Sequence, residues 1–457
     1  MKNSVLGTSN DVLINGSIPR SIFVLALPLL VRAVLQSLQS VVDIFWVGKL
    51  GPTSLAAVAM ASTVIMAFFP LLIGIGTGTI ALISRAIGAK NQYAADNAAT
   101  QSMIIALFTA LILCIIGITF SEPLLRLLQA KGDVLEQGTL YLKILLLGGI
   151  TTTLLFLGCA ILQGAGNATT PMKIMSLSVI ANIILDPILI FGLIGAPRLE
   201  VKGAAIATIL AQALGCVAIL YILLKGKSHI HIKFSQFKIR LKTMWQIIKI
   251  GVPSSIQMLS RNLMSMILIA IVASFGTYAI AAYGIGMRLR MIVLLPAFSF
   301  GTASAVLVGQ NLGAKNPHRA KMCAWCATII NAAIMLCIGI LFFIFAENII
   351  RLFNNNPEVI AVGGNYLRIT SLFFPTIALG VVLGRSLMGA GNTIPPMIIT
   401  IITLWAIQIP LALILPRYTN LGISGIWWAI VSASTIQGLL ISIWFQKGHW
   451  KKKEIKF

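Results

Sequence analysis

Acidic residues are scarce in this chain. Of its 457 residues only 11 are Asp or Glu, against 34 Lys or Arg, and charged residues of all kinds make up 10%. Ordinary soluble domains carry about a quarter charged residues. Hydrophobic residues reach 58% and the mean hydropathy is +0.97. The composition therefore excludes a typical soluble domain and indicates a membrane protein.

Histidine and cysteine are few as well. All four histidines fall in predicted loops or in the tail (His229, His231, His318 and His449). Cys323 and Cys326 have the spacing of a redox or zinc pair, but the sequence offers no second pair and no neighbouring His ligand set. We interpret these two thiols as ordinary apolar packing residues.

The usual sequence signals of catalysis are missing too. The chain contains no phosphate-binding Gly-Lys-Ser/Thr loop and no arrangement of nucleophile and base. An integral-membrane enzyme would need acids or histidines gathered near an interface, which the sequence does not offer. We therefore predict no enzyme and no cofactor. Any transport would draw its energy from an ion gradient or from the gradient of the cargo itself.

What the chain has in abundance is long apolar runs. A helix needs about 20 consecutive apolar residues to cross the hydrocarbon core of a bilayer. We predict spans at 19–47, 53–83, 95–120, 136–162, 171–195, 203–224, 244–272, 278–309, 320–346, 360–388, 395–416 and 422–446. The predicted fold class is an all-α polytopic membrane protein with twelve transmembrane helices in two pseudo-symmetric six-helix lobes.

The two lobes follow from a repeat at a constant offset of 225 residues. Gly88-Ala89-Lys90-Asn91 returns as Gly313-Ala314-Lys315-Asn316, and Gly164-Ala165-Gly166-Asn167 returns as Gly389-Ala390-Gly391-Asn392. Two like halves are common in secondary transporters, although duplication without mechanical consequence is an alternative. We predict an N-lobe at 1–224, a basic cytoplasmic linker at 225–243, a C-lobe at 244–446 and a basic cytoplasmic tail at 447–457.

The formal net charge of +23 could suggest a nucleic-acid partner. Whether it does depends on how the basic residues are distributed along the chain. With a cytoplasmic N-terminus, the inside segments and the span ends that adjoin them hold nineteen Lys and Arg, and the outside segments hold seven. This positive-inside bias predicts a multi-pass protein of the cytoplasmic (inner) membrane with both termini in the cytoplasm. The excess charge would contact anionic lipid rather than nucleic acid. The first apolar segment is too long for a cleavable signal peptide.

Only two acids, Asp43 and Asp186, lie in the interior of a predicted span, since the other nine fall in loops, tails or span ends. A charged side chain at mid-helix costs about 2.5–3.5 kcal/mol on insertion scales, so it indicates a function. Asp43 ends a polar stripe of Arg32, Gln36 and Gln39 on one helical face. Asn182 precedes Asp186 by one helical turn. Thr208 and Gln212 have the same spacing in the next span.

Proline residues interrupt the helical pattern in the two spans that contain these acids. Pro187 follows Asp186 and has no N–H for the carbonyl of Ile183, which is therefore free to bind a cation. Pro28 lies within the first span and predicts a second kink. Carboxylates, amide, hydroxyl and carbonyl form an all-oxygen set suited to Na⁺ or to a shared proton. Alternatively Asp43 pairs with an arginine and Asp186 caps a kink. Arg32, however, is about 16 Å along the helix from Asp43.

Several motifs together resemble the multidrug and toxic compound extrusion (MATE) family. They are the run Val42–Gly51, Asn182-x-x-x-Asp186-Pro187, Gly203–Thr208 and the doubled Gly-Ala-Lys-Asn and Gly-Ala-Gly-Asn loops. The resemblance covers essentially the whole chain and is closer to the branch akin to DNA-damage-inducible and archaeal members. It implies two six-helix lobes and exchange of cargo for Na⁺ or H⁺. It also implies a cation site in the N-lobe at Asp43, Asn182, Asp186 and Thr208, with Gln36 beside it.

The second half lacks such a site but carries basic residues. No acid lies in its spans, and the repeat places Leu268 opposite Asp43. Arg261, Arg288, Arg290 and Arg385 lie within or near these spans without an acidic neighbour in the sequence. They either snorkel or bond to carbonyls, or one of them meets an anionic cargo group or stabilises an inward gate.

We therefore predict a monomeric secondary antiporter that exports amphipathic organic compounds in exchange for H⁺ or Na⁺. The alternative is a lipid-linked precursor flippase of related two-lobe architecture, which a cavity lined by basic residues would favour.

Overall fold

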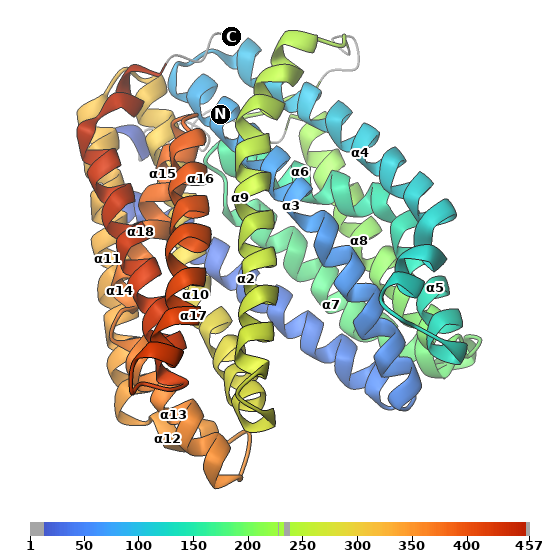
Figure 1. Ribbon diagram of the computed structural model, residues 1–457. Helices are drawn as coiled ribbons and strands as arrows, with labels where there is room; N and C mark the ends of the chain where they lie inside the picture. Colours follow the sequence, from blue (N-terminus) through green and yellow to red (C-terminus); the bar gives the residue numbers. More distant parts are fainter. Residues whose placement is uncertain (1–12, 227, 233–237, 454–457) are drawn as a thin grey trace. The chain divides into compact units, whose positions relative to one another are not determined.

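The computed structural model describes residues 13–226, 228–232 and 238–453, and this part of the chain is helical with no β-strand (Figure 1). Ten of its helices are long and apolar enough to cross a membrane, and two bent helix pairs bring the possible spans to 12. Each of the twelve predicted spans corresponds to one of these helices or pairs, and the fold class is confirmed. The end of the predicted tail, 454–457, and two internal parts of the predicted linker, 227 and 233–237, lie outside the described residues, as does 1–12.

The first half of the chain forms α2 to α8. The bounds are α2 Ile18–Gly48, α3 Pro52–Gly88, α4 Gln92–Leu127, α5 Gly132–Leu147, α6 Gly149–Gly164, α7 Thr169–Phe191 and α8 Glu200–Leu224, with a 3₁₀ turn η1 at Leu193–Gly195. Helix α7 packs along α8, and α3 packs against α4, α5 and α6. Small residues allow these close contacts: the backbone of α8 at Gly203 lies against that of Leu189 in α7, leaving no room for a Cβ atom.

The second half forms α9 to α18. The bounds are α9 Leu241–Ala273, α10 Thr277–Gly313, α11 Pro317–Ile344, α12 Ala346–Arg351, α13 Pro357–Ser371, α14 Phe374–Ala378, α15 Gly384–Gly389, α16 Ile394–Ile401, α17 Ile409–Tyr418 and α18 Ser424–Lys447, with π segments η3 Leu379–Leu383 and η4 Ile402–Gln408 and a 3₁₀ turn η5 His449–Lys452. Helix α10 is a central element that packs against α11, α13 and α15.

The chain divides into two compact units whose borders lie inside two long helices. Unit 1 comprises Leu27–Val252, and unit 2 contains the described residues 13–26 and 253–453. The predicted lobes, 1–224 and 244–446, differ from these units because α2 and α9 each belong to both. The first turns of α2 pack within unit 2, and the first turns of α9 pack within unit 1. The borders fall next to Pro28 and at Pro253, two prolines that the 225-residue repeat relates.

The predicted spans at 136–162 and 360–388 are bent rather than straight. Helices α5 and α6 meet at 49° around Gly148, and α13 and α14 meet at 57° before Pro375. Glycine and proline disfavour a continuous helix, which accounts for both bends. The π segment η4 ends at Gln408, two residues before Pro410. This proline has no N–H to donate to the carbonyl of Ala406, so the hydrogen-bond ladder changes register near it.

The duplicated loops fold alike in both halves. Lys90 and Lys315 have φ of 55° and 59°, and Gly166 and Gly391 have φ of 87° and 78°. The following asparagines, Asn91 and Asn316, each accept a hydrogen bond at 3.0 Å from the backbone N–H three residues later. Asparagine thus caps the next helix. The repeat therefore encodes the same tight elbows twice.

Candidate cation site

Asn182 and Asp186 lie one turn apart on the buried face of α7, where both side chains have no exposed surface. The amide Nδ2 of Asn182 donates a hydrogen bond of 3.1 Å to Oδ1 of Asp186. Helix α7 continues through Pro187 to Phe191, so the proline lies inside a helix rather than at its end. The predicted helical face is therefore present, and it points into unit 1.

Asp43 of α2 meets this pair from another helix. Its carboxyl group lies within hydrogen-bonding reach of the carboxyl group of Asp186, and both residues belong to unit 1. Two carboxylates cannot both be charged at such a distance without strong repulsion, unless a proton or a cation lies between them. The pairing of Asp43 with an arginine, which the sequence left open, is not seen among the described ion pairs.

Three buried oxygens of this cluster have no hydrogen-bond donor: Oδ1 of Asp43, Oδ2 of Asp186 and Oδ1 of Asn182. Buried polar atoms nearly always form a hydrogen bond, so three buried oxygens without a donor in one cluster require an explanation. Oxygen atoms are the ligands that a hard cation such as Na⁺ prefers, and a single proton shared by the carboxyls would also relieve the charge. The residues present therefore fit either coupling ion.

Tyr141 of α5 is a member of this neighbourhood that the sequence reasoning did not single out. It is buried in the apolar core of unit 1 and lies within electrostatic range of both Asp43 and Asp186. A lone tyrosine in an apolar span carries no signal of its own in one sequence. Only its recurrence as Tyr366 in the repeat set it apart.

The other predicted residues lie farther from the pair or use their polar atoms locally. Gln36 is exposed on α2, two turns before Asp43. The hydroxyl of Thr208 donates to the carbonyl of Ala204 in α8 at 3.0 Å, and Thr208 itself forms no described hydrogen bond with Asp43 or Asp186. Pro28 lies inside α2 next to the border between units. Within the described ranges, no group of three His, Cys, Asp or Glu could hold a metal ion.

Unit 2 contains a cluster of arginines instead. Arg261 of α9 lies within electrostatic range of Arg290 and Arg385. Arg385 donates a hydrogen bond of 2.9 Å to the hydroxyl of Thr302, and its guanidinium lies 5.0 Å from the ring centroid of Phe298. The backbone at Gly301 makes room for it, because a Cβ atom there would lie 2.8 Å from Cδ of Arg385.

None of these three arginines forms an ion pair with a described residue. The acids of unit 2 that the structure describes, Glu347 and Glu358, lie elsewhere, and Glu347 pairs with Arg368 at 3.0 Å. Arg288 is exposed on α10. The cluster therefore carries several positive charges without a protein counter-charge.

Known proteins resemble this chain over nearly its whole length. A protein named "Probable multidrug resistance protein NorM" from Thermotoga maritima is 29% identical over 441 residues, covering 96% of this chain and 94% of that protein. A protein named "FAD transporter" from Shewanella oneidensis is 27% identical over 433 residues, covering 93% and 94%. A solved structure of a MOP superfamily transporter from Pyrococcus furiosus, 28% identical, superimposes with a TM-score of 0.90 over 98% of this chain and 99% of that one.

The family profile described as MatE matches residues 28–188 and again 253–414. The two matches begin 225 residues apart, so the profile finds the same repeat that the sequence shows. Together they cover more than half of the chain, and the first match contains Asp43, Asn182 and Asp186. The chain belongs to the MatE family.

Proposed function

We propose that the protein is a secondary antiporter that exports amphipathic organic compounds, including several unrelated drugs, in exchange for H⁺ or Na⁺. Multidrug efflux is supported by the names of the relatives, which include multidrug resistance and multidrug export proteins. The cytoplasmic membrane as location, both termini in the cytoplasm and a monomeric state complete the proposal.

A single observation carries the coupling part of the proposal. The carboxyls of Asp43 and Asp186 lie within hydrogen-bonding reach in a membrane span, and three oxygens of the Asp43–Asn182–Asp186 cluster lack a donor. A cation or proton entering the cluster would neutralise it, and its departure would restore the repulsion. One elementary charge crossing 100 mV supplies about 2.3 kcal/mol, enough for about 50-fold accumulation of cargo.

The first prediction tests this cluster. Asp43→Asn and Asp186→Asn keep the shape of each side chain but remove its charge, so each variant should insert normally and lose gradient-driven efflux. The double variant should be no worse than either, because residues that act as one unit are not additive. Uptake of a fluorescent cation into everted vesicles, which corresponds to export from the cell, is measured under separately imposed pH and Na⁺ gradients, which also identifies the ion.

Asp133→Asn is the matched control, since it makes the same change at an exposed acid in the first turn of α5. It should transport like the unmodified protein. Normal transport by either Asp43→Asn or Asp186→Asn at normal expression would remove that residue from the coupling site.

A second candidate function is movement of an anionic amphiphile, such as a lipid-linked precursor. The arginine cluster of Arg261, Arg290 and Arg385, which has no described acidic partner, favours it. The second prediction is that Arg261→Gln should lower uptake of an anionic fluorescent amphiphile at least tenfold while efflux of a cationic dye stays within about twofold. Parallel losses for both cargos would argue against recognition of an anion.

A further inference from the structure

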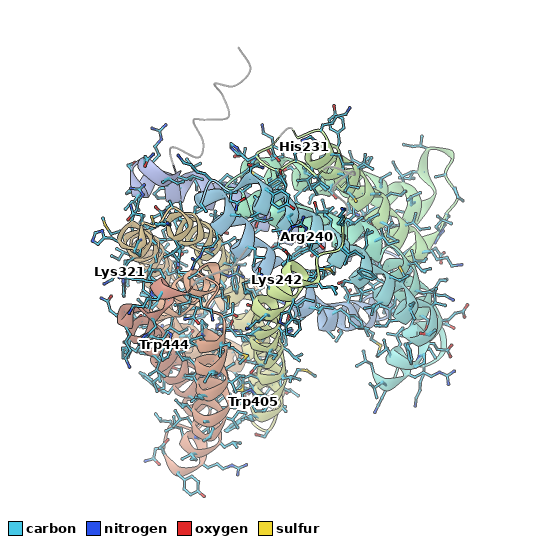
Figure 2. The ribbon with its side chains drawn as sticks, turned by 90° about the horizontal axis from the view of Figure 1, so that it is seen from above. His231, Arg240, Lys242, Lys321, Trp405 and Trp444 are labelled. Atoms are coloured by element: carbon cyan, nitrogen blue, oxygen red, sulfur yellow. The ribbon has the colours of Figure 1, made fainter. Side chains whose placement is uncertain are left out.

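A pocket of about 550 Å³ opens at one end of unit 1, away from the aspartates. Its wall is formed by the end of α3, the first turns of α4 and the first turns of α9. The side chains that matter for its chemistry are Leu82, Tyr93, Asn97, Arg240 and Lys242. Figure 2 shows Arg240 and Lys242 side by side where α9 begins. The volume is within the range of sites that hold small molecules.

The charged side of this pocket is purely basic. Arg240 and Lys242 are both exposed, and neither forms an ion pair with a residue that the structure describes. The guanidinium of Arg240 stacks over the ring of Tyr93 at 5.0 Å and donates a hydrogen bond to its hydroxyl. A guanidinium held over an aromatic ring keeps its remaining N–H groups available for an anion.

The polar wall is held in place by buried hydrogen bonds. Gln101, which has no exposed surface, accepts from the backbone N–H of Arg240 at 3.0 Å and donates to the carbonyl of Lys238 at 2.8 Å. Asn97 donates to the hydroxyl of Thr243 at 3.0 Å. These hydrogen bonds from α4 fix the backbone that carries Arg240 and Lys242, so the wall of the pocket has a defined structure.

The apolar surroundings place this pocket at a membrane boundary. Tyr93, Leu241 and Trp245 are all exposed, with Leu241 and Trp245 at 75% and 64%. Exposed Trp and Tyr beside Lys and Arg are typical of the level of the lipid headgroups. An anionic group bound here would have both a basic contact and an apolar one within reach.

We propose that this pocket binds the phosphate headgroup of an anionic phospholipid, with Arg240 and Lys242 on the phosphate and the acyl chains along Leu241 and Trp245. Basic pockets between helices on the cytoplasmic side bind anionic headgroups in this manner. The site is separate from the coupling cluster and does not depend on it. A bound lipid would join the first turns of α9 to α3 and α4.

The test counts lipids on the purified full-length protein by native mass spectrometry with added phosphatidylglycerol or phosphatidylcholine. We expect one phosphatidylglycerol molecule to bind tightly to each protein and no phosphatidylcholine molecule to bind with comparable affinity. The double variant Arg240→Gln, Lys242→Gln should bind phosphatidylglycerol about 30-fold more weakly, since one basic residue near an anionic surface contributes about fivefold. Phosphatidylglycerol should also raise the Tm of the unmodified protein, and not that of the variant.

The double variant Lys173→Gln, Lys225→Gln is the control, because it removes two exposed charges from unit 1 outside the pocket. Its affinity should stay within about twofold. Equal weakening of both double variants, or full binding by the pocket variant, would overturn the proposal. Inorganic phosphate and glycerophosphate at millimolar concentration should not displace the lipid. Displacement would indicate that the pocket binds a soluble phosphate compound and would overturn the proposal of a lipid site.

Discussion

At the scale of single residues, the candidate site consists of polar side chains that are brought together by the packing of helices. Asn182 and Asp186 share one helix, so their 3.1 Å hydrogen bond follows from spacing alone. The approach of Asp43 to Asp186 joins residues more than a hundred positions apart in the sequence, and only the assembled unit 1 brings it about. The three buried oxygens without a hydrogen-bond donor lie close together only once this cluster has assembled.

The third prediction concerns Tyr141. Tyr141→Phe removes the hydroxyl near both aspartates and keeps the ring in the core of unit 1. We expect the apparent affinity for the coupling ion to fall by roughly threefold, because the hydroxyl dipole lies within electrostatic range of both aspartates in a buried environment. The measurement is cargo efflux as a function of ion concentration.

Tyr366→Phe changes the repeat-related tyrosine, which lies in the core of unit 2, and serves as the comparison. Its ion dependence should match that of the unmodified protein. An unchanged ion dependence in Tyr141→Phe would reduce Tyr141 to a packing residue.

At the scale of elements, the first turns of α9 are fastened to α3 by backbone contact. An added Cβ at Gly78 would lie 2.2 Å from the carbonyl oxygen of Ile247, and one at Gly251 would lie 2.7 Å from that of Gly74. Glycine is required at these two positions because two helix backbones approach each other closely. The contact holds the start of α9 within unit 1.

The fourth prediction follows from this contact. Gly78→Ala should force α3 and α9 apart and destabilise the protein by about 1–3 kcal/mol. Thermal unfolding in detergent measures the effect. Gly284→Ala is the control, because a Cβ atom at this position in α10 would have no neighbouring atom within 4 Å. The control should be neutral or slightly stabilising. A Gly78→Ala variant as stable as the control would contradict the close contact.

At the scale of the whole molecule, the twelve spans could be predicted because each is set by a local run of apolar residues. The bends at Gly148 and before Pro375 could not be placed, since glycine and proline occur in many spans that stay helical. The sharing of α2 and α9 between units was beyond reach, because it depends on contacts between distant segments. The same limit explains why the sequence does not show that Tyr141 lies near Asp43 and Asp186.

The fifth prediction tests the orientation of the chain. In a variant without its six cysteines, Lys131→Cys should react with a membrane-impermeant maleimide in intact cells, since positive-inside bias places this exposed residue outside. Lys315→Cys, exposed at the repeated elbow, should react only after permeabilisation. The reverse pattern of labelling would invert the topology and would place the lipid pocket on the outer face.

The division of α2 between the units has a consequence for synthesis. Residues 13–26 leave the ribosome long before their packing partners in unit 2, which begin at Pro253. At about 5–20 residues per second, these first turns wait on the order of tens of seconds for their partners. The later portion of α2 also waits for the first turns of α9 before unit 1 is complete. Neither half of the gene product can therefore mature alone, and a chain cut in the linker should regain its native state only when both fragments are made together.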